Sequence, residues 1–139
     1  MKVLTFILLC FMNIGLYSSL QAQIGLGGSS MGNAASGVIE FETKEFDFGK
    51  AVQGDTVRHI YRFKNAGTGD LEIKHVKTGC ECTSSNWKPG PYKMGASGEI
   101  EIIFATKDKS GPQQKGIIVE TNGDKPIEII RLTGEVVLE

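Results

Sequence analysis

A strictly alternating segment between residues 56 and 64 constrains the fold of this chain more than any other feature. Its two interleaved sets of side chains are Val57, His59, Tyr61 and Phe63 on one side and Arg58, Ile60, Arg62 and Lys64 on the other. Residues two apart share a face in a β-strand, because the side chains of an extended chain point alternately up and down. The segment therefore predicts a strand with one dry face and one wet, mostly cationic face.

Shorter segments with the same two-residue period recur towards the C-terminus, separated by turn residues. They cover residues 38–41, 46–48, 71–78, 98–104, 117–119 and 127–137. Gly49 is expected to end one strand, and residues 65–70 and Asn122-Gly123 are expected to form turns. The adjacent Ile129-Ile130 pair changes the phase of the last strand, which predicts a bulge or a strand buried on both faces.

Residues 86–91 are expected to interrupt regular structure, with Trp87 capping one end of the fold. No segment of the mature chain shows a convincing helical period. About seven or eight short strands without a helix are typical of sandwiches. We therefore predict an all-β chain, folded over residues 38–139 as an immunoglobulin-like antiparallel β-sandwich.

The first 22 residues have the layout of a secretory signal peptide. Met1-Lys2 is a short positive end, residues 3–17 are almost wholly apolar, and Ala22 offers a small residue for cleavage before Gln23. The apolar run is short for a transmembrane helix, which needs about 20 residues, and an uncleaved anchor is the alternative. Residues 23–37, rich in Gly and Ser, predict a flexible linker. We expect an exported protein of the periplasm or extracellular space, with no membrane span after cleavage.

The charge balance and the motifs narrow the classes of function. Lys and Arg number 15, Asp and Glu number 16, and the formal net charge is −1. Such a balance gives no long-range attraction to phosphate, so nucleic acid is not an expected partner. The sequence also lacks the His-Glu-x-x-His and Cys-x-x-Cys motifs of common catalytic sites. We therefore expect a protein that is not an enzyme.

Cys80 and Cys82 form the one constellation that could carry chemistry. In an extended strand both thiols would point to one face and could hold Cu(I) or Zn²⁺. His59, His75 and Met94 are conceivable further ligands, since zinc normally takes four. The simpler interpretation makes His59 a hydrogen-bonded core histidine and His75 a surface residue.

The same two cysteines also predict a disulfide, because an even number in an exported chain is typical of one. A straight strand separates residues two apart by about 6.5 Å, at the upper end of what a disulfide spans, so the chain must bend near Gly79. A ring of about three residues contributes only about 1.6 kcal/mol in the chain-entropy model. A structural thiol pair or local disulfide, a metal site and a redox centre are therefore three open alternatives, and no cofactor is the leading expectation.

Five motifs, in this order and spacing, resemble a bacterial family known as domain of unknown function 1573. They are Phe46-Asp47-Phe48-Gly49, His59–Gly67, Gly79-Cys80-Glu81-Cys82-Thr83, Gly95–Ile100 and Leu132–Val136. The family is related to immunoglobulin-like modules grouped with major sperm protein and cilia-associated proteins. The resemblance implies this fold and an envelope setting, and it implies no activity. Met94 replaces the family's usual proline, and Glu81 replaces a small residue between the cysteines.

The sequence thus predicts an exported, non-enzymatic binding or structural module whose partner is another envelope protein. The alternative is copper or zinc binding, or thiol redox exchange, at Cys80 and Cys82.

Overall fold

The computed structural model of the chain describes residues 35–139. The signal peptide at 1–22, its cleavage between Ala22 and Gln23, and most of the linker at 23–37 fall outside these residues and stay predictions. In the described part, no helix is long and apolar enough to cross a membrane. Ser36 and Gly37 already contact the domain, because their carbonyls accept hydrogen bonds from the amides of Gly69 and Asp124.

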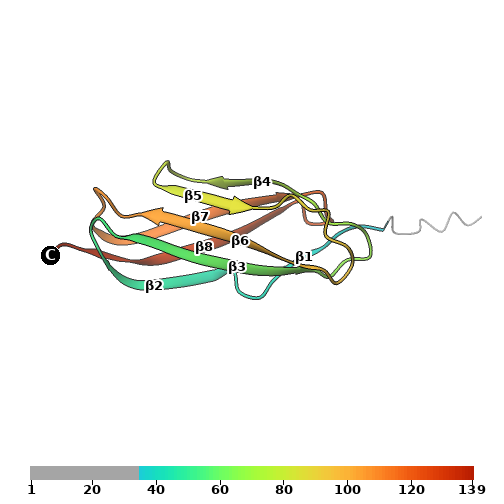
Figure 1. Cartoon of the computed structure of the whole chain (residues 1–139), viewed down its shortest axis with the longest axis horizontal. Coiled ribbons are helices and arrows are strands. Elements are labelled where there is room, and N and C mark those ends of the chain that lie inside the picture. Colours follow the sequence, from blue (N-terminus) through green and yellow to red (C-terminus); the bar gives the residue numbers. More distant parts are fainter. Residues whose placement is uncertain (1–34) are drawn as a thin grey trace, which may run out of the picture. The chain divides into compact units, whose positions relative to one another are not determined.

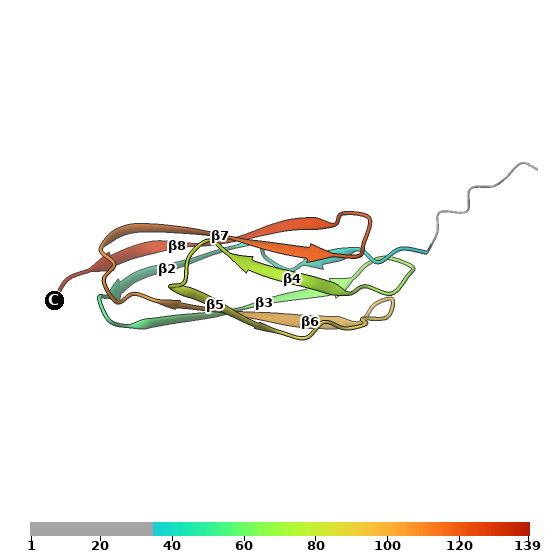
Figure 2. The same ribbon diagram turned by 90° about the horizontal axis from the view of Figure 1, so that it is seen from above.

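Residues 35–139 form eight strands in two sheets of four (Figures 1 and 2). The strands are β1 (Ile39–Phe41), β2 (Glu45–Val52), β3 (Thr56–Asn65), β4 (Ile73–Thr78), β5 (Thr83–Trp87), β6 (Ser97–Ala105), β7 (Gly111–Thr121) and β8 (Ile127–Val137). One sheet has the order β1-β3-β6-β5 and is called the β3–β6 sheet; the other has the order β2-β8-β7-β4 and is called the β7–β8 sheet. The two sheets face each other, which confirms the predicted β-sandwich.

The predicted dry face of β3 lies in the core. Tyr61 and Phe63 are buried, while Arg62 and Lys64 between and beyond them are exposed. The other fully buried large side chains come from both sheets and from the loop before β4: Leu71, Ile73, Ile100, Ile102, Phe104, Ile117, Val119, Ile130, Leu132 and Val136. Alternation along each strand thus gives each sheet an apolar inner face, and burying these two faces against each other drives the fold.

A hydrogen bond joins the two sheets through this core. The Tyr61 hydroxyl, on β3, donates to the backbone carbonyl of Arg131 on β8 at 2.7 Å. Burial raises the pKa of Tyr61 to about 12. A phenol in this position can be buried because its one polar group has a partner.

The wet face of β3 is neutralised by acids on its neighbours. Arg58 pairs with Glu101 at 3.3 Å, Arg62 with Glu99 at 3.0 Å, and Lys64 with Glu40 at 3.7 Å. These cations do not guard a sheet edge, because β3 lies between β1 and β6. They form a solvated face with little net charge.

The β7–β8 sheet is not purely antiparallel, in contrast to the prediction. β2 pairs with β8 in parallel, and the register shifts between Asp47 and Lys50. Gly49 does not end the strand as expected; with a φ of 68° it sits at this irregularity, and β2 continues to Val52. Opposite the shift, Gly134 makes room for Phe48, because a Cβ there would lie 2.5 Å from the phenyl ring.

The Ile129-Ile130 pair marks neither a bulge nor a strand buried on both faces. β8 pairs with β7 in unbroken register, with Ile130 opposite Ile117 and Ile129 opposite Ile118. Ile130 is buried, whereas Ile129 is 46% exposed on the outer face. The prediction was wrong because an isoleucine at an outward position disturbs the hydrophobic pattern without disturbing the backbone.

Asn65, at the end of β3, fastens three segments with one side chain. Its Oδ1 accepts hydrogen bonds from the amides of Val38 and Gly67 at 3.0 and 2.9 Å. Its Nδ2 donates to the carbonyls of Gly69 and Tyr92 at 2.7 and 2.8 Å. The side chain is buried and uses four hydrogen bonds, so the loops at this end of the sandwich are held in a fixed arrangement.

Candidate functional site

Cys80 and Cys82 lie in the turn that carries the chain from β4 to β5, and so from one sheet to the other. The chain has the bend near Gly79 that the disulfide alternative required, and not the extended geometry of the metal alternative. Gly79 and Cys80 form the bend, and Glu81 and Cys82 form a tight turn. The two Cα atoms are 5.2 Å apart and the sulfur atoms are bonded. Glu81 points to solvent at the tip, while both cysteines are half-buried.

The backbone around the disulfide is held by hydrogen bonds. The Thr83 amide donates to the carbonyl of Cys80 at 3.2 Å, and the Ala105 amide on β6 donates to the carbonyl of Cys82 at 2.9 Å. The Thr78 hydroxyl donates to the carbonyl of Thr83 at 2.8 Å. The turn is therefore one ordered unit with the start of β5.

The conceivable metal ligands lie on separate elements. His75 is exposed on β4, and Met94 is exposed in the loop between β5 and β6. His59, on β3, stacks on the ring of Phe46 with centroids 3.7 Å apart, and burial lowers its pKa. Within residues 35–139, no group of three or more His, Cys, Asp or Glu side chains could hold a metal ion. A copper or zinc site at the cysteines stays a prediction, and it would first need the disulfide to be reduced.

His59 is not the hydrogen-bonded core histidine that we expected. It is half-buried, and its side chain makes no hydrogen bond within residues 35–139. Its contacts are aromatic instead, with Phe46 on one face and Tyr61 edge-on at 4.6 Å. Ring stacking at the margin of the core accounts for its place in the alternating pattern.

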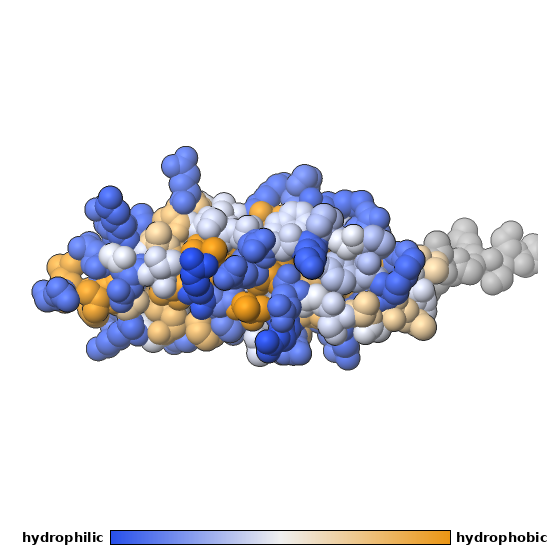
Figure 3. Space-filling model, viewed as in Figure 1, coloured by the Kyte–Doolittle hydropathy of each residue, from blue (hydrophilic) through white to orange (hydrophobic). Residues whose placement is uncertain are grey.

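A shallow hollow of about 790 Å³ lies on the outer face of the β3–β6 sheet. Ile60 on β3, Trp87 on β5 and Tyr92 in the following loop supply its apolar lining. Ile60 is 44% exposed, an unusual setting for an isoleucine between two arginines. Figure 3 shows this face of the molecule, with apolar patches surrounded by charged side chains.

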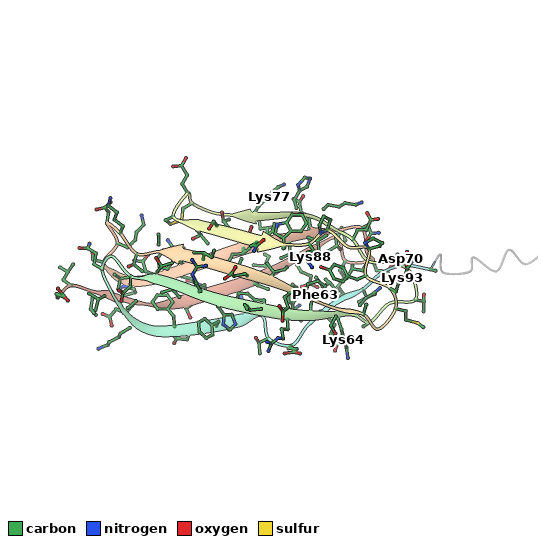
Figure 4. All side chains as sticks on the ribbon, in the orientation of Figure 1. Phe63, Lys64, Asp70, Lys77, Lys88 and Lys93 are labelled. Carbon is green, nitrogen blue, oxygen red and sulfur yellow. A yellow bond between two sulfur atoms is a disulfide. The ribbon has the colours of Figure 1, made fainter. Side chains whose placement is uncertain are left out.

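The polar lining of the hollow is held in place by contacts within the sheet. Arg62 and Glu99 form one of the cross-strand ion pairs described above. The Tyr92 hydroxyl donates to the carbonyl of Lys88 at 2.9 Å, and burial raises the pKa of Tyr92. Lys88 follows β5 directly (Figure 4). Fixed polar groups around an apolar centre are what a recognition surface needs.

Gly98 on β6 creates the space for Tyr92. A Cβ at this position would lie 2.4 Å from the ring of Phe63 and 2.5 Å from the ring of Tyr92. The two rings meet edge to face, with centroids 5.0 Å apart. The Tyr92 ring can therefore pack against Phe63 because residue 98 has no side chain to fill that space.

Sequence reasoning missed this surface because it missed β5. Thr83-Ser84-Ser85-Asn86 has no apolar alternation, and the segment from Asn86 was expected to break regular structure. Trp87 is the last residue of β5 and packs half-buried against the core, so it is not a loop cap. The sequence did hold one signal for this surface: two large aromatic residues, Trp87 and Tyr92, lie five residues apart on either side of Pro89.

Comparisons with known proteins place the chain in a family. A family model described as "Protein of unknown function (DUF1573)" matches residues 39–136. No curated protein matches the chain.

Solved structures share the fold. A protein of unknown function from Porphyromonas gingivalis W83 has a TM-score of 0.64 at 21% identity, over 73% of this chain and 48% of that one. The ASH/PapD-like domain 7 of human CEP192 has a TM-score of 0.62 at 16% identity, over 75% of this chain and 88% of that one. The secreted serine protease VesC from Vibrio cholerae has a TM-score of 0.53 at 13% identity, over 70% and 23%.

At these identities the likeness shows the fold alone, and the chain spans about half the length of the Porphyromonas gingivalis protein. The PapD-like neighbour confirms the immunoglobulin-like architecture. Since the family model covers most of the chain and all eight strands begin within its limits, the chain belongs to the DUF1573 family of proteins of unknown function.

Proposed function

We propose that this chain is an exported, non-enzymatic binding module of the bacterial envelope, and that the hollow on the β3–β6 sheet receives its partner. The observation that carries the proposal is the apolar lining of the hollow, made by exposed Ile60 with half-buried Trp87 and Tyr92 and bordered by the Arg58–Glu101 and Arg62–Glu99 ion pairs. Aromatic side chains at the centre and polar groups at the rim are typical of protein interfaces.

Rigid support strengthens the proposal. The hollow rests on β3, β6 and β5, which pair in continuous register. A partner would therefore meet preorganised side chains and lose little free energy to ordering them.

Export is supported by two features of the chain. Residues 1–22 have the layout of a signal peptide. The Cys80–Cys82 disulfide belongs to a kind of bond that persists in oxidising compartments such as the periplasm.

Photo-crosslinking in living cells tests the proposal. A photoreactive amino acid replaces Ile60 in the full-length chain, and a matched variant carries it at Lys50, exposed on the β7–β8 sheet. We expect a discrete crosslinked product from position 60 that is absent from position 50, with an envelope protein identified in it by mass spectrometry. A Trp87→Ala change should reduce that product.

Two results would contradict the proposal. Crosslinking of equal yield and pattern from both positions would mean that the hollow has no special partner. Retention of the chain in the cytoplasmic fraction would remove the envelope setting.

A further inference from the structure

β5 differs from the other three sheet edges of the sandwich in residues 35–139. The four edge strands are β1, β5, β2 and β4. β1 has three residues, β2 carries a register shift and a lysine, and β4 carries a register shift and two lysines. Short length, irregular register and lysine are the features that protect an edge from pairing with another chain. β5, with the sequence Thr-Ser-Ser-Asn-Trp, has five residues in regular register and no charged residue or proline.

The backbone groups that β5 leaves free can be identified. The Ala105 amide bonds the Cys82 carbonyl, so Cys82, Ser84 and Asn86 direct their backbone groups towards β6. Thr83, Ser85 and Trp87 point to the open edge. Thr83 is satisfied there by Cys80 and Thr78. Within residues 35–139, the amides of Ser85 and Trp87 donate no backbone hydrogen bond to another segment, and their carbonyls accept none.

This open edge adjoins the hollow. Trp87 contributes to both, and Asn86 beside it also lines the hollow. A strand added to β5 would place alternate side chains on the outer face of the sheet, next to Asn86, because side chains in paired strands share faces. One of these side chains could enter the hollow.

We infer that β5 takes up an extended segment of a partner protein as an additional strand of the β3–β6 sheet. The free groups of Ser85 and Trp87 bond its backbone, and the hollow receives one of its apolar side chains. This inference rests on the proposed function and specifies the part of the partner that binds. That part is an extended, uncharged segment with an apolar residue at every second position.

A second copy of this chain fits the edge less well. If β5 of another molecule were added, its outward side chains would be Ser84 and Asn86, which are polar and short. They would leave the apolar lining uncovered. The occupant is therefore a different segment.

A library of random twelve-residue linear peptides, displayed on phage and panned against the full-length chain, tests the inference. We expect enriched peptides with apolar residues at alternate positions. In the complex with such a peptide, hydrogen exchange at the amides of Ser85 and Trp87 should slow at least tenfold. Ser85→Pro, which removes the free amide at an edge position where proline is tolerated, should weaken binding at least tenfold. Ser85→Ala, which keeps the amide, should bind within twofold of the original chain.

Each contrary result overturns the inference. No enriched peptide, unchanged exchange at Ser85 and Trp87, or equal binding by a folded Ser85→Pro variant would remove it. If Ser85→Pro fails to fold, the exchange measurement on the unaltered chain decides alone. A dimer that protects the same amides would assign the edge to a second copy. A crosslink from position 60 together with unprotected Ser85 and Trp87 amides would leave the binding module intact and reject strand addition.

Discussion

The side-chain amide of Asn65 donates a hydrogen bond to the backbone carbonyl of Tyr92 at 2.8 Å, and so ties the end of β3 to the loop that walls the hollow. The same nitrogen donates to Gly69, and the side-chain oxygen accepts from Val38 and Gly67. The loop is also held by the backbone of Leu71, whose amide and carbonyl both pair with Tyr92. Nearby, Lys93 and Asp70 form an ion pair at 2.6 Å between the same two loops (Figure 4).

Asn65→Ala should therefore be strongly destabilising. It leaves four backbone groups without their partner in a buried place, and we expect the free energy of unfolding to fall by about 2–4 kcal/mol. Urea unfolding measures the change. The control is Asn86→Ala, an exposed position whose effect should stay within about 0.5 kcal/mol. Equal losses for the two variants would show that the Asn65 contacts do not stabilise the fold.

Because of Tyr61, the free energy of unfolding should fall as the pH rises into the alkaline range. Its pKa is raised from 10.0 to about 12 in the folded protein, so the folded state favours the neutral phenol. This contribution is complete below pH 10 and is lost as the pH rises through 12. We expect the original chain to lose about 2 kcal/mol more than Tyr61→Phe between pH 9 and pH 12. At pH 7, Tyr61→Phe should cost about 1–2 kcal/mol, because the Arg131 carbonyl loses its donor. Chemical unfolding at each pH measures both, and identical pH profiles would refute the assignment.

Gly134 and Gly116 are a matched pair of glycines in neighbouring strands of the β7–β8 sheet. A Cβ on Gly134 would lie 2.5 to 2.6 Å from three ring carbons of Phe48, whereas a Cβ on Gly116 would have nothing within 4 Å. Gly134→Ala should lower the free energy of unfolding by about 1–3 kcal/mol. Gly116→Ala should be neutral or stabilising by up to about 1 kcal/mol.

A second change separates the clash from other effects at Gly134. Phe48→Leu in the Gly134→Ala background should recover part of the loss, since the smaller side chain vacates the space of the ring. Simple additivity of the two changes, measured by thermal or urea unfolding, would mean that the ring contact is not the cause.

The Cys80–Cys82 disulfide should contribute little to stability. It closes a very small ring, so Cys80→Ser with Cys82→Ser should cost no more than about 1–2 kcal/mol and leave the sandwich folded. Comparing the unfolding of the oxidised chain, the reduced chain and the double variant measures this. Unfolding on reduction alone would show that the turn is a structural staple.

The metal alternative has a separate test on the same variant. The reduced chain is titrated with Cu(I), and the protein purified from the envelope is analysed for intact mass and bound metal. Stoichiometric binding that the double serine variant loses would establish the copper prediction. Undetectable binding under reducing conditions would end it.

The sandwich was predictable because the apolar core residues alternate with polar residues along individual strands, and this alternation can be recognised within each segment alone. Tyr61 and Phe63 fall on alternate positions of a ten-residue strand, and such a period has one structural interpretation. The parallel pairing of β2 with β8 has no comparable signal, because it joins segments from opposite ends of the domain. Gly49 was expected to end a strand because a glycine suits a strand end and a strand irregularity equally well.

The hollow and the Asn65 hydrogen bonds could not be predicted from any single segment of the sequence, because both depend on contacts between segments that lie far apart in the chain. Asn65 was expected in a turn, and its residue type agrees with one. Its burial depends on three segments converging on one amide, which no single segment encodes. β5 likewise owes its extended form to pairing with β6, since its own residues are small and polar.

The parallel alignment of β2 and β8 sets how the domain responds to tension. A pull on the amino end of β2 at Glu45 and on the carboxyl end of β8 at Val137 drives the two strands past each other along their length. The paired residues from Glu45–Arg131 to Val52–Val137 then share the load, so no bond can open far ahead of the next. An antiparallel pair pulled apart from one end would unzip bond by bond under a much smaller force. Tension applied between Glu45 and Val137 therefore loads the β2–β8 pair in shear.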